Sequence, residues 1–209
     1  LEVQAGIDTN NSHVNIWAET SPKGNGQNYN VGQNSIVVGY QNTTDNEAGH
    51  DGKVAIGAKN TSTNNASTAV GNENKATGGA ATAVGAGNTA SGKASVALGN
   101  VNNADAKAAI AIGTYNNVNY TKGSWQTTPK PAGEYSTVVG NYSSATGTSA
   151  SAMGVYTNAT GAGSFAAGYN NNANGQNSVA IGSENTSHVA DTVTLGQFNN
   201  AKTMGGISI

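Results

Sequence analysis

The stretch GKASVALGNVNNADAKAAIAIG, residues 92–113, contains nearly the same phrase twice. The phrase SVALG at residues 95–99 returns as AIAIG at residues 109–113, fourteen residues later. Both versions alternate small and aliphatic residues with a period of two, which is typical of a β-strand whose two faces meet different surroundings. The residues between the two phrases are mostly polar. The stretch therefore indicates a repeating unit of one strand and one turn region.

The same phrase recurs along most of the chain and ends each time in a glycine. Eight of the ten intervals between these glycines are 14 residues long, and the other two, of 18 and 27 residues, correspond to one unit plus an insertion. Glycine takes positive φ without a Cβ clash, so we expect a tight bend at each of them. The expected bend glycines are Gly39, Gly57, Gly71, Gly85, Gly99, Gly113, Gly140, Gly154, Gly168, Gly182 and Gly196.

Many of the 14-residue repeats carry a second glycine seven residues before the glycine that ends the phrase, as at Gly78 and Gly92. Each 14-residue repeat thus divides into two half-turns, and we expect one flattened coil per repeat. Stacking such coils at the strand spacing of about 4.8 Å pairs every strand in parallel with those of the neighbouring coils. Asparagines recur near the bends and are expected to form side-chain ladders between coils. They include Asn60, Asn74, Asn88, Asn102, Asn171 and Asn185.

The alternation separates the residues of each strand into an alanine-rich set and an aliphatic set. The small set fits the inside of a narrow coil, whereas a single thin coil has almost no interior in which to bury the aliphatic set. An uncovered aliphatic stripe favours self-association. The residues that we expect to pack in the core or against another copy of the chain are Val96, Leu98, Ile110, Ile112, Val179 and Ile181.

The composition narrows the class of protein. Of the 209 residues only 10% are charged and 6% are aromatic, 29 are glycine and none is cysteine, whereas about 25% are charged in ordinary globular proteins. The net charge is −2 with nine Lys and Arg, so no basic stripe suits a nucleic acid. No apolar run of about 18 residues occurs, and we expect no direct membrane insertion by this segment. Disulfides and thiolate metal sites are excluded.

Two segments resemble the head repeat of the YadA-like family of trimeric autotransporter adhesins. NSVAIG at residues 177–182 matches the repeat letter for letter, and ASGKASVALG at residues 90–99 matches it closely. The resemblance covers about residues 30–196. It implies a left-handed parallel β-roll, a homotrimer, and a place on the outer membrane of a Gram-negative bacterium, through parts that this chain does not carry. The implied function is non-catalytic attachment to host extracellular matrix, host cells or other bacteria.

The expected domain organisation follows from where the repeat begins and ends. Residues 1–25 are expected to cap the first coil, which otherwise has an unpaired strand edge, and HVNIWAE at residues 13–19 is expected to be a strand. The head β-roll extends over residues 26–196, with insertions near 43–50 and 120–132. TVTLG at residues 192–196 resembles the start of the family's neck, and residues 197–209 are expected to be a neck-like C-terminal segment.

The second insertion, YTKGSWQTTPKPA, concentrates aromatic residues, prolines and lysines that are rare elsewhere in the chain. Loops on rigid scaffolds often contain the residues that bind a ligand, and Trp and Tyr are favoured anchor residues in such sites. Alternatively, Trp125 packs back onto the roll or onto a neighbouring chain. The candidate ligand-binding residues are Tyr115, Tyr120, Lys122, Trp125 and Lys130.

Other chemistries are less well supported. GNTASGKA at residues 87–94 has the spacing of a phosphate-binding loop, but Ala94 replaces the Ser or Thr that holds Mg²⁺ and no helix pattern follows. Three histidines have no partner at ligand spacing, and three acidic residues in the first insertion indicate either a weak cation site or an exposed polar loop. We expect no cofactor and no metal. These residues are His13, His50 and His188, and Asp45, Glu47 and Asp51.

An ice-binding or fibre-type structural solenoid is the alternative function. A flat face with a regular column of threonines would favour it. Thr68, Thr82 and Thr137 are instead scattered among valines and isoleucines at the strand positions. The repeat therefore favours an adhesin head.

Overall fold

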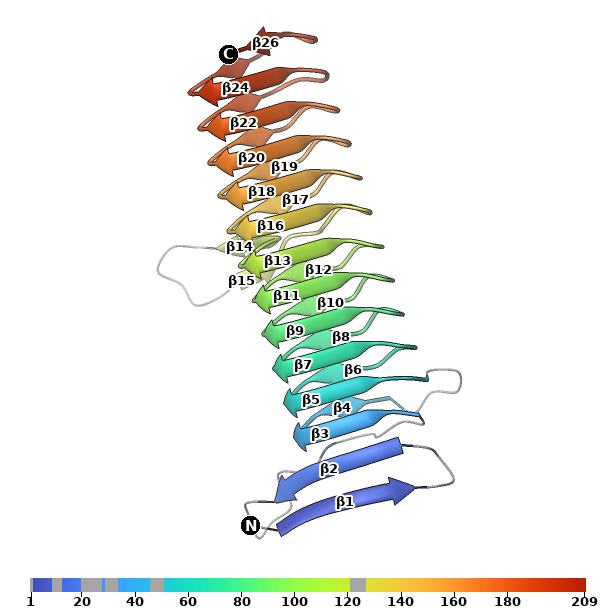
Figure 1. Ribbon diagram of the computed structural model, residues 1–209. Coiled ribbons are helices and arrows are strands. Elements are labelled where there is room, and N and C mark those ends of the chain that lie inside the picture. The colour runs from blue at the N-terminus through green and yellow to red at the C-terminus, as the bar shows by residue number, and fades with distance from the viewer. Residues whose placement is uncertain (1, 9–12, 20–27, 29–33, 46–50, 121–126) are drawn as a thin grey trace. The chain divides into compact units, whose positions relative to one another are not determined.

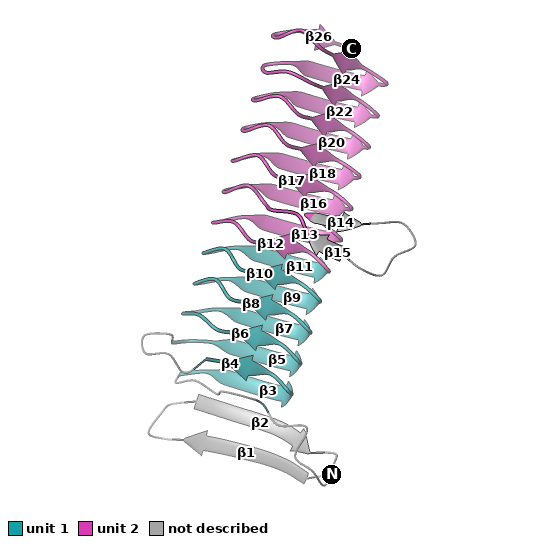
Figure 2. Cartoon of the chain, turned by 180° about the vertical axis from the view of Figure 1, so that it is seen from behind, with its two compact units in different colours: residues 1–100 teal, residues 101–209 magenta. Residues whose placement is uncertain are grey.

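A computed structural model describes residues 2–8, 13–19, 28, 34–45, 51–120 and 127–209. The described chain is all β and contains no helix, and hence no helix long and apolar enough to cross a membrane. It divides into two compact units, Leu1–Asn100 and Val101–Ile209, coloured separately in Figure 2. Each unit is a parallel β-solenoid of coils of about 14 residues, as the sequence predicts.

The longer strands of unit 1 lie side by side in the order β1-β2-β3-β5-β7-β9-β11 (Figure 1). The first two are antiparallel, β2 pairs with β3 in parallel, and every later pair is parallel. The expected strand at residues 13–19 is β2. The strands are β1 (Glu2–Asp8), β2 (His13–Glu19), β3 (Ile36–Tyr40), β5 (Val54–Ala58), β7 (Thr68–Asn72), β9 (Thr82–Ala86) and β11 (Val96–Asn100).

Each long strand from β3 to β9 is followed by a two-residue strand, and these short strands pair with one another in parallel on the other side of the coil. One coil therefore contains one long strand, a bend, one short strand and a second turn. The short strands of unit 1 are β4 (Thr43–Thr44), β6 (Thr61–Ser62), β8 (Lys75–Ala76) and β10 (Thr89–Ala90).

Unit 2 repeats this arrangement with a long-strand order of β13-β16-β18-β20-β22-β24-β26. The long strands are β13 (Ile110–Thr114), β16 (Thr137–Asn141), β18 (Ser151–Val155), β20 (Phe165–Tyr169), β22 (Val179–Ser183), β24 (Val193–Gln197) and β26 (Ile207–Ser208). The short strands are β12 (Asn103–Ala104), β17 (Ser144–Ala145), β19 (Asn158–Ala159), β21 (Asn172–Ala173), β23 (Thr186–Ser187) and β25 (Asn200–Ala201). Two further strands, β14 (Val118–Tyr120) and β15 (Thr127–Pro129), form an antiparallel pair.

The register places equivalent residues of successive coils next to one another, as in the pairing of Ala69 with Ala83 and of Gly71 with Gly85. The second residue of each long strand is buried and is usually alanine, whereas the first and third residues are half-buried or exposed. The division into an inner alanine set and an outer aliphatic set is thereby confirmed. The core is thin because it is built mainly from alanine, serine, threonine and asparagine.

The glycines that end the repeated phrase lie inside the long strands, in the fourth position, and not at the bend. Their φ values range from 103° to 152°. A Cβ on Gly85 would overlap the carbonyl oxygen of Gly99 in the next coil, so glycine is required for the close approach of neighbouring coils. The bend follows two residues later, at positions such as Lys59 and Glu73, each with φ of 55°.

An internal ladder of asparagine side chains, the amide ladder, connects the coils within each unit. Asn74 is representative: its side-chain Nδ2 donates to Asn60 Oδ1 at 3.0 Å, to the Val70 carbonyl at 3.0 Å and to the Gly85 carbonyl at 2.7 Å. Such buried groups are stable only when their hydrogen bonds are made. The expected ladder is confirmed by the bonds from Asn74 to Asn60, from Asn88 to Asn74 and from Asn185 to Asn171.

Candidate functional site

The insertion in unit 2 leaves the coil through β14 and returns through β15. Tyr120 belongs to β14 and pairs in register with Thr127. Lys122 and Trp125 lie outside the described residues. The structure therefore describes the base of the insertion, where Tyr115 precedes β14 and Lys130 follows β15 in the sequence.

Asn117 closes the coil at the point where the insertion begins. Its Nδ2 donates to the Asn103 carbonyl at 2.9 Å, and its Oδ1 accepts from the Ala145 backbone N–H at 2.9 Å. In a regular coil a peptide group of the short strand makes these two bonds to its neighbours. The Asn117 carbonyl is instead bonded to the Lys130 N–H at 2.8 Å. The Asn117 side chain thus takes the place of the missing peptide group.

Lys130 anchors the returning end of the insertion to the next coil. Its ammonium donates to Ser144 Oγ at 2.8 Å, and Ser144 Oγ donates in turn to Asn158 Oδ1 at 2.7 Å. The side chain is half-buried, and this burial lowers the pKa of Lys130 below its usual value. Lys130 therefore has a structural contact at the base of the insertion.

Tyr115 is the first member of an aromatic stack along unit 2. Its ring lies 5.2 Å from that of Tyr142 with 7° between the planes, and Tyr142 lies 5.2 Å from Tyr156 with 16° between the planes. Tyr169 meets Tyr156 edge-on, with centroids 6.2 Å apart. Tyr142 and Tyr156 were not among the predicted residues. Their spacing of 14 residues, and of 27 from Tyr115 across the insertion, was the signal in the sequence.

The stacked tyrosines occupy the bend position and have left-handed backbones, with φ of 54° at Tyr115, 55° at Tyr142 and 58° at Tyr156. This conformation costs about 1–2 kcal/mol per non-glycine residue. In the coils of Tyr142 and Tyr156, Ser143 and Thr157 replace the asparagine of the amide ladder, whereas the coil of Tyr115 keeps Asn116. The aromatic stack thus provides contacts between coils where the amide ladder is interrupted.

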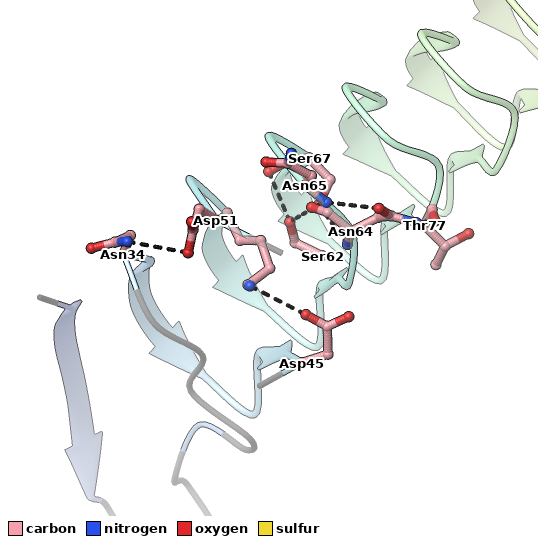
Figure 3. Close-up of polar contacts among 9 residues, drawn as sticks. Asn34, Asp45, Asp51, Ser62, Asn64, Asn65, Ser67 and Thr77 are labelled. Carbon is pink, nitrogen blue, oxygen red and sulfur yellow. Dashed lines mark hydrogen bonds and ion pairs between the residues drawn. The ribbon is translucent and has the colours of Figure 1, made fainter. Parts of the chain in front are cut away.

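The acidic residues of the first insertion form ion-pair and amide contacts. Asp45 Oδ1 lies 3.2 Å from the Nζ of Lys53 in an ion pair that lacks the geometry of a hydrogen bond, and Figure 3 shows this contact as a dashed line to Asp45. The Lys53 side chain is fully buried. Asp51 Oδ1 accepts from Asn34 Nδ2 at 3.1 Å. Glu47 and His50 lie outside the described residues. Across the described residues, no cluster of three or more His, Asp or Glu could hold a metal ion.

The segment with phosphate-loop spacing belongs to the coil. Thr89 and Ala90 form β10, and Gly87 and Ala94 have φ of 65° and 57° at the two turns. No helix follows this segment. The segment thus lacks the helix N-terminus that such a loop presents to phosphate.

Threonines do not form a regular column on the long strands. Thr68 and Thr82 are neighbours in register, but Val54 precedes them and Val96 follows them. Thr137 lies between Ile110 and Ser151. A flat threonine array of the kind expected for an ice-binding solenoid is therefore missing from the described long strands.

The residues predicted for packing all lie on the outer side of the long strands. Ile181 is 38% exposed, and the others are half-buried, so none is a core residue of the single chain. The core position is the second position of each of these strands, between two of the predicted residues. It is taken by alanine because only a small side chain fits inside the coil. The half-buried residues are Val96, Leu98, Ile110, Ile112 and Val179.

Each unit has an aliphatic face of its own. In unit 1 the exposed side chains include Ile36 at 45% and Ile56 at 37%, and in unit 2 they include Met153 at 44%. Each belongs to the first or third position of a long strand. An exposed aliphatic row of this kind is characteristic of a surface that another protein covers.

Comparison with protein families gives a match to the YadA head domain repeat (2 copies), at residues 76–102, 90–116, 132–157 and 159–185. The matched segments leave out residues 117–131, which contain β14 and β15. A search of curated proteins finds no match. The matched family consists of structural adhesins of Gram-negative bacteria and is not an enzyme family. Through the repeats between residues 76 and 185, the chain belongs to the YadA-like head domains of trimeric autotransporter adhesins.

Proposed function

We propose that the chain is the adhesive head module of a homotrimeric surface protein and acts without catalysis. It attaches the bacterium to host extracellular matrix, host cells or other bacterial cells. The observation that carries the proposal is the aliphatic face of the long strands, which remains half-buried or exposed in the single chain. Burial of such surface contributes about 25 cal/mol per Å², so its association with other copies is favourable.

The proposed assembly is a trimer of left-handed parallel β-rolls around a common axis. Its support is the family match together with the uncovered aliphatic rows of both units. Three identical copies present each binding surface three times, and the linked sites raise avidity without any single strong site. This property suits attachment to surfaces on which targets are repeated.

The proposed location is the surface of a Gram-negative bacterium. We assign residues 1–25 to a cap, residues 26–196 to the roll and residues 197–209 to the approach to a neck. In the structure, β26 pairs in parallel with β24 through Val193 and Ile207, which adds a partial coil after residue 196. The cap assignment is supported by β2, which pairs with the first coil strand, β3.

The insertion is proposed to contribute to recognition through Tyr115, Tyr120, Lys122, Trp125 and Lys130. Deletion of residues 120–132 restores a 14-residue interval between Gly113 and Gly140. We expect the deletion variant to assemble as the parent does and to lose binding to part of a panel of matrix proteins, host cells and bacterial cells.

The matched control for the deletion is Ala162→Leu, a change at an exposed turn residue in the same unit. Adhesion of the intact chain to no member of the panel would contradict the adhesive function. Unchanged binding of the deletion variant to every target would place recognition on the repeat faces instead of the insertion.

A further inference from the structure

Unit 1 contains a groove that neither the aliphatic face nor the insertion uses. It encloses about 590 Å³ along the turns that precede the long strands, and three successive coils line it. Asn64, Asn65 and Thr77 are visible at these turns in Figure 3. The lining includes the polar residues and the open glycine Asn64, Asn65, Thr77, Gly79, Ser91 and Lys93.

The groove is open where Gly79 provides no side chain. The same turn position is Asn65 in the preceding coil and Lys93 in the following coil, and both are exposed. These two side chains are therefore separated by two coil spacings, about 9.6 Å at the usual distance between strands. A ligand group between them would contact the backbone of Gly79 directly.

The fold does not require glycine at position 79. Its φ lies outside the left-handed region, and an added Cβ would meet Asn64 Oδ1 at 3.7 Å, an ordinary contact. Gly78 differs, since a Cβ there would overlap the carbonyl oxygen of Gly92. A glycine that the backbone does not need is typical of a place where a ligand approaches closely.

The groove is lined by amides, hydroxyls, one ammonium group and the small apolar surfaces of Ala66 and Ala80, without an aromatic or large aliphatic side chain. Within the part of the chain that the structure describes, the Lys93 ammonium has no ion pair and the Asn65 side chain has no hydrogen bond. An apolar ligand would leave these groups without partners at a cost in free energy. The lining suits a ligand with many hydroxyls and one negative charge.

We propose that this groove binds a glycan that carries a carboxylate, of the sialic-acid or uronic-acid class. The carboxylate pairs with the Lys93 ammonium, and sugar hydroxyls bond to Asn65 and Ser91 over the backbone of Gly79. An acidic peptide offers the same charge but not the hydroxyls that the neutral amides and alcohols of the lining would bond. The inference rests on the proposed adhesive function and names one class of target for it.

The test measures binding of the full chain to sialyllactose, to a uronate tetrasaccharide, to neutral lactose and to a tetraglutamate peptide. We expect the two carboxylated sugars to bind and lactose to bind about tenfold more weakly, because it lacks the charged hydrogen-bond acceptor. Gly79→Leu fills the groove and should abolish binding, and Lys93→Gln should weaken it about tenfold.

Two control variants separate this site from the rest of the surface. Ala162→Leu changes the same turn position in unit 2, and Lys75→Gln removes an exposed lysine of β8 outside the groove. Both should bind as the parent does, and Gly79→Leu should unfold at the parent temperature. Equal binding of lactose, unchanged binding of folded Gly79→Leu, or binding of the peptide in place of the sugars would overturn the proposal.

The failures of the two proposals are distinguishable. If the chain adheres to matrix proteins or cells but binds no oligosaccharide, the groove is not a glycan site and the adhesive function stands. If folded chain binds the oligosaccharides but adheres to no cell or matrix protein, the groove proposal stands and the adhesive function is wrong.

Discussion

The rings of Tyr142 and Tyr156 stack 5.2 Å apart in two successive coils whose amide-ladder position holds Ser143 and Thr157. Ser143 Oγ accepts from Thr157 Oγ1 at 3.0 Å and donates to the Gly154 carbonyl at 3.1 Å. A hydroxyl makes fewer bonds than an amide. The interior contacts between coils are thus reduced where the aromatic contacts at the surface are added.

Replacement of Tyr142 by asparagine tests the contribution of the stack. Asparagine is favoured at positive φ, so the change removes two ring contacts without adding backbone strain. Stacked pairs contribute about 0.5–1.5 kcal/mol each, and we expect a net loss of about 1 kcal/mol in the free energy of unfolding. Ser143→Asn should restore about the same amount by completing the ladder. Urea unfolding of both single variants and the double variant measures this, and no loss on Tyr142→Asn would contradict the role of the stack.

Asn117→Ala should be among the most destabilising changes at the base of the insertion. It leaves the Ala145 N–H and the Asn103 carbonyl without their partners, at about 1–3 kcal/mol for each buried group. Asn170→Ala is the matched control, because Asn170 is exposed and has the same φ of 51°. The difference between the two variants in thermal unfolding isolates the two hydrogen bonds. Equal effects would show that the Asn117 side chain does not replace a peptide group.

Asp45→Asn should destabilise unit 1 by about 3 kcal/mol, because Lys53 then remains buried without a counter-charge among the described residues. Lys53→Ser combined with Asp45→Asn should recover most of this loss, since serine occupies the same position in other coils, at Ser67 and Ser95. Glu73→Gln is the control: the exposed Lys59–Glu73 pair, at 3.4 Å, contributes at most about 1 kcal/mol. Chemical unfolding distinguishes the three variants. A double variant that is less stable than Asp45→Asn would refute the role of the pair.

Gly85→Ala and Gly79→Ala should differ strongly in stability although both are single methyl additions. Gly85 has φ of 122°, and its Cβ would overlap the Gly99 carbonyl oxygen, so we expect a loss on the order of 3 kcal/mol or more. Gly79→Ala has room for the methyl group and should change stability by less than about 0.5 kcal/mol. Similar melting temperatures for the two variants would contradict the close approach of the long strands.

The regular part of the fold follows from the sequence because its information is periodic. The 14-residue interval predicts the coil, the alternation around Ala97 and Ala111 predicts the inner and outer faces, and the recurring asparagines predict the amide ladder. The exact place of Gly57 was not predictable in this way. Its role depends on the distance to the carbonyl oxygen of Gly71 in the next coil, and a spacing of glycines in the sequence does not contain that distance.

The irregular features depend on contacts between coils that break the period. Asn117 acts as a peptide mimic only because the chain departs at Val118, and its neighbour Asn116 has the same residue type with a ladder role. Lys53 occurs at a position where most other coils have serine or alanine, and its partner Asp45 is eight residues away across the first insertion. Residue types alone do not identify such pairs.

The most direct test of the central claim is the mass of the folded chain by sedimentation equilibrium. We expect a single species of three times the chain mass of 20.8 kDa, because the aliphatic rows of the long strands are covered only on association. Replacing Ile56 and Ile181 by threonine should weaken this assembly, since both side chains are exposed in the single chain. A stable folded monomer of 20.8 kDa would contradict the trimeric head.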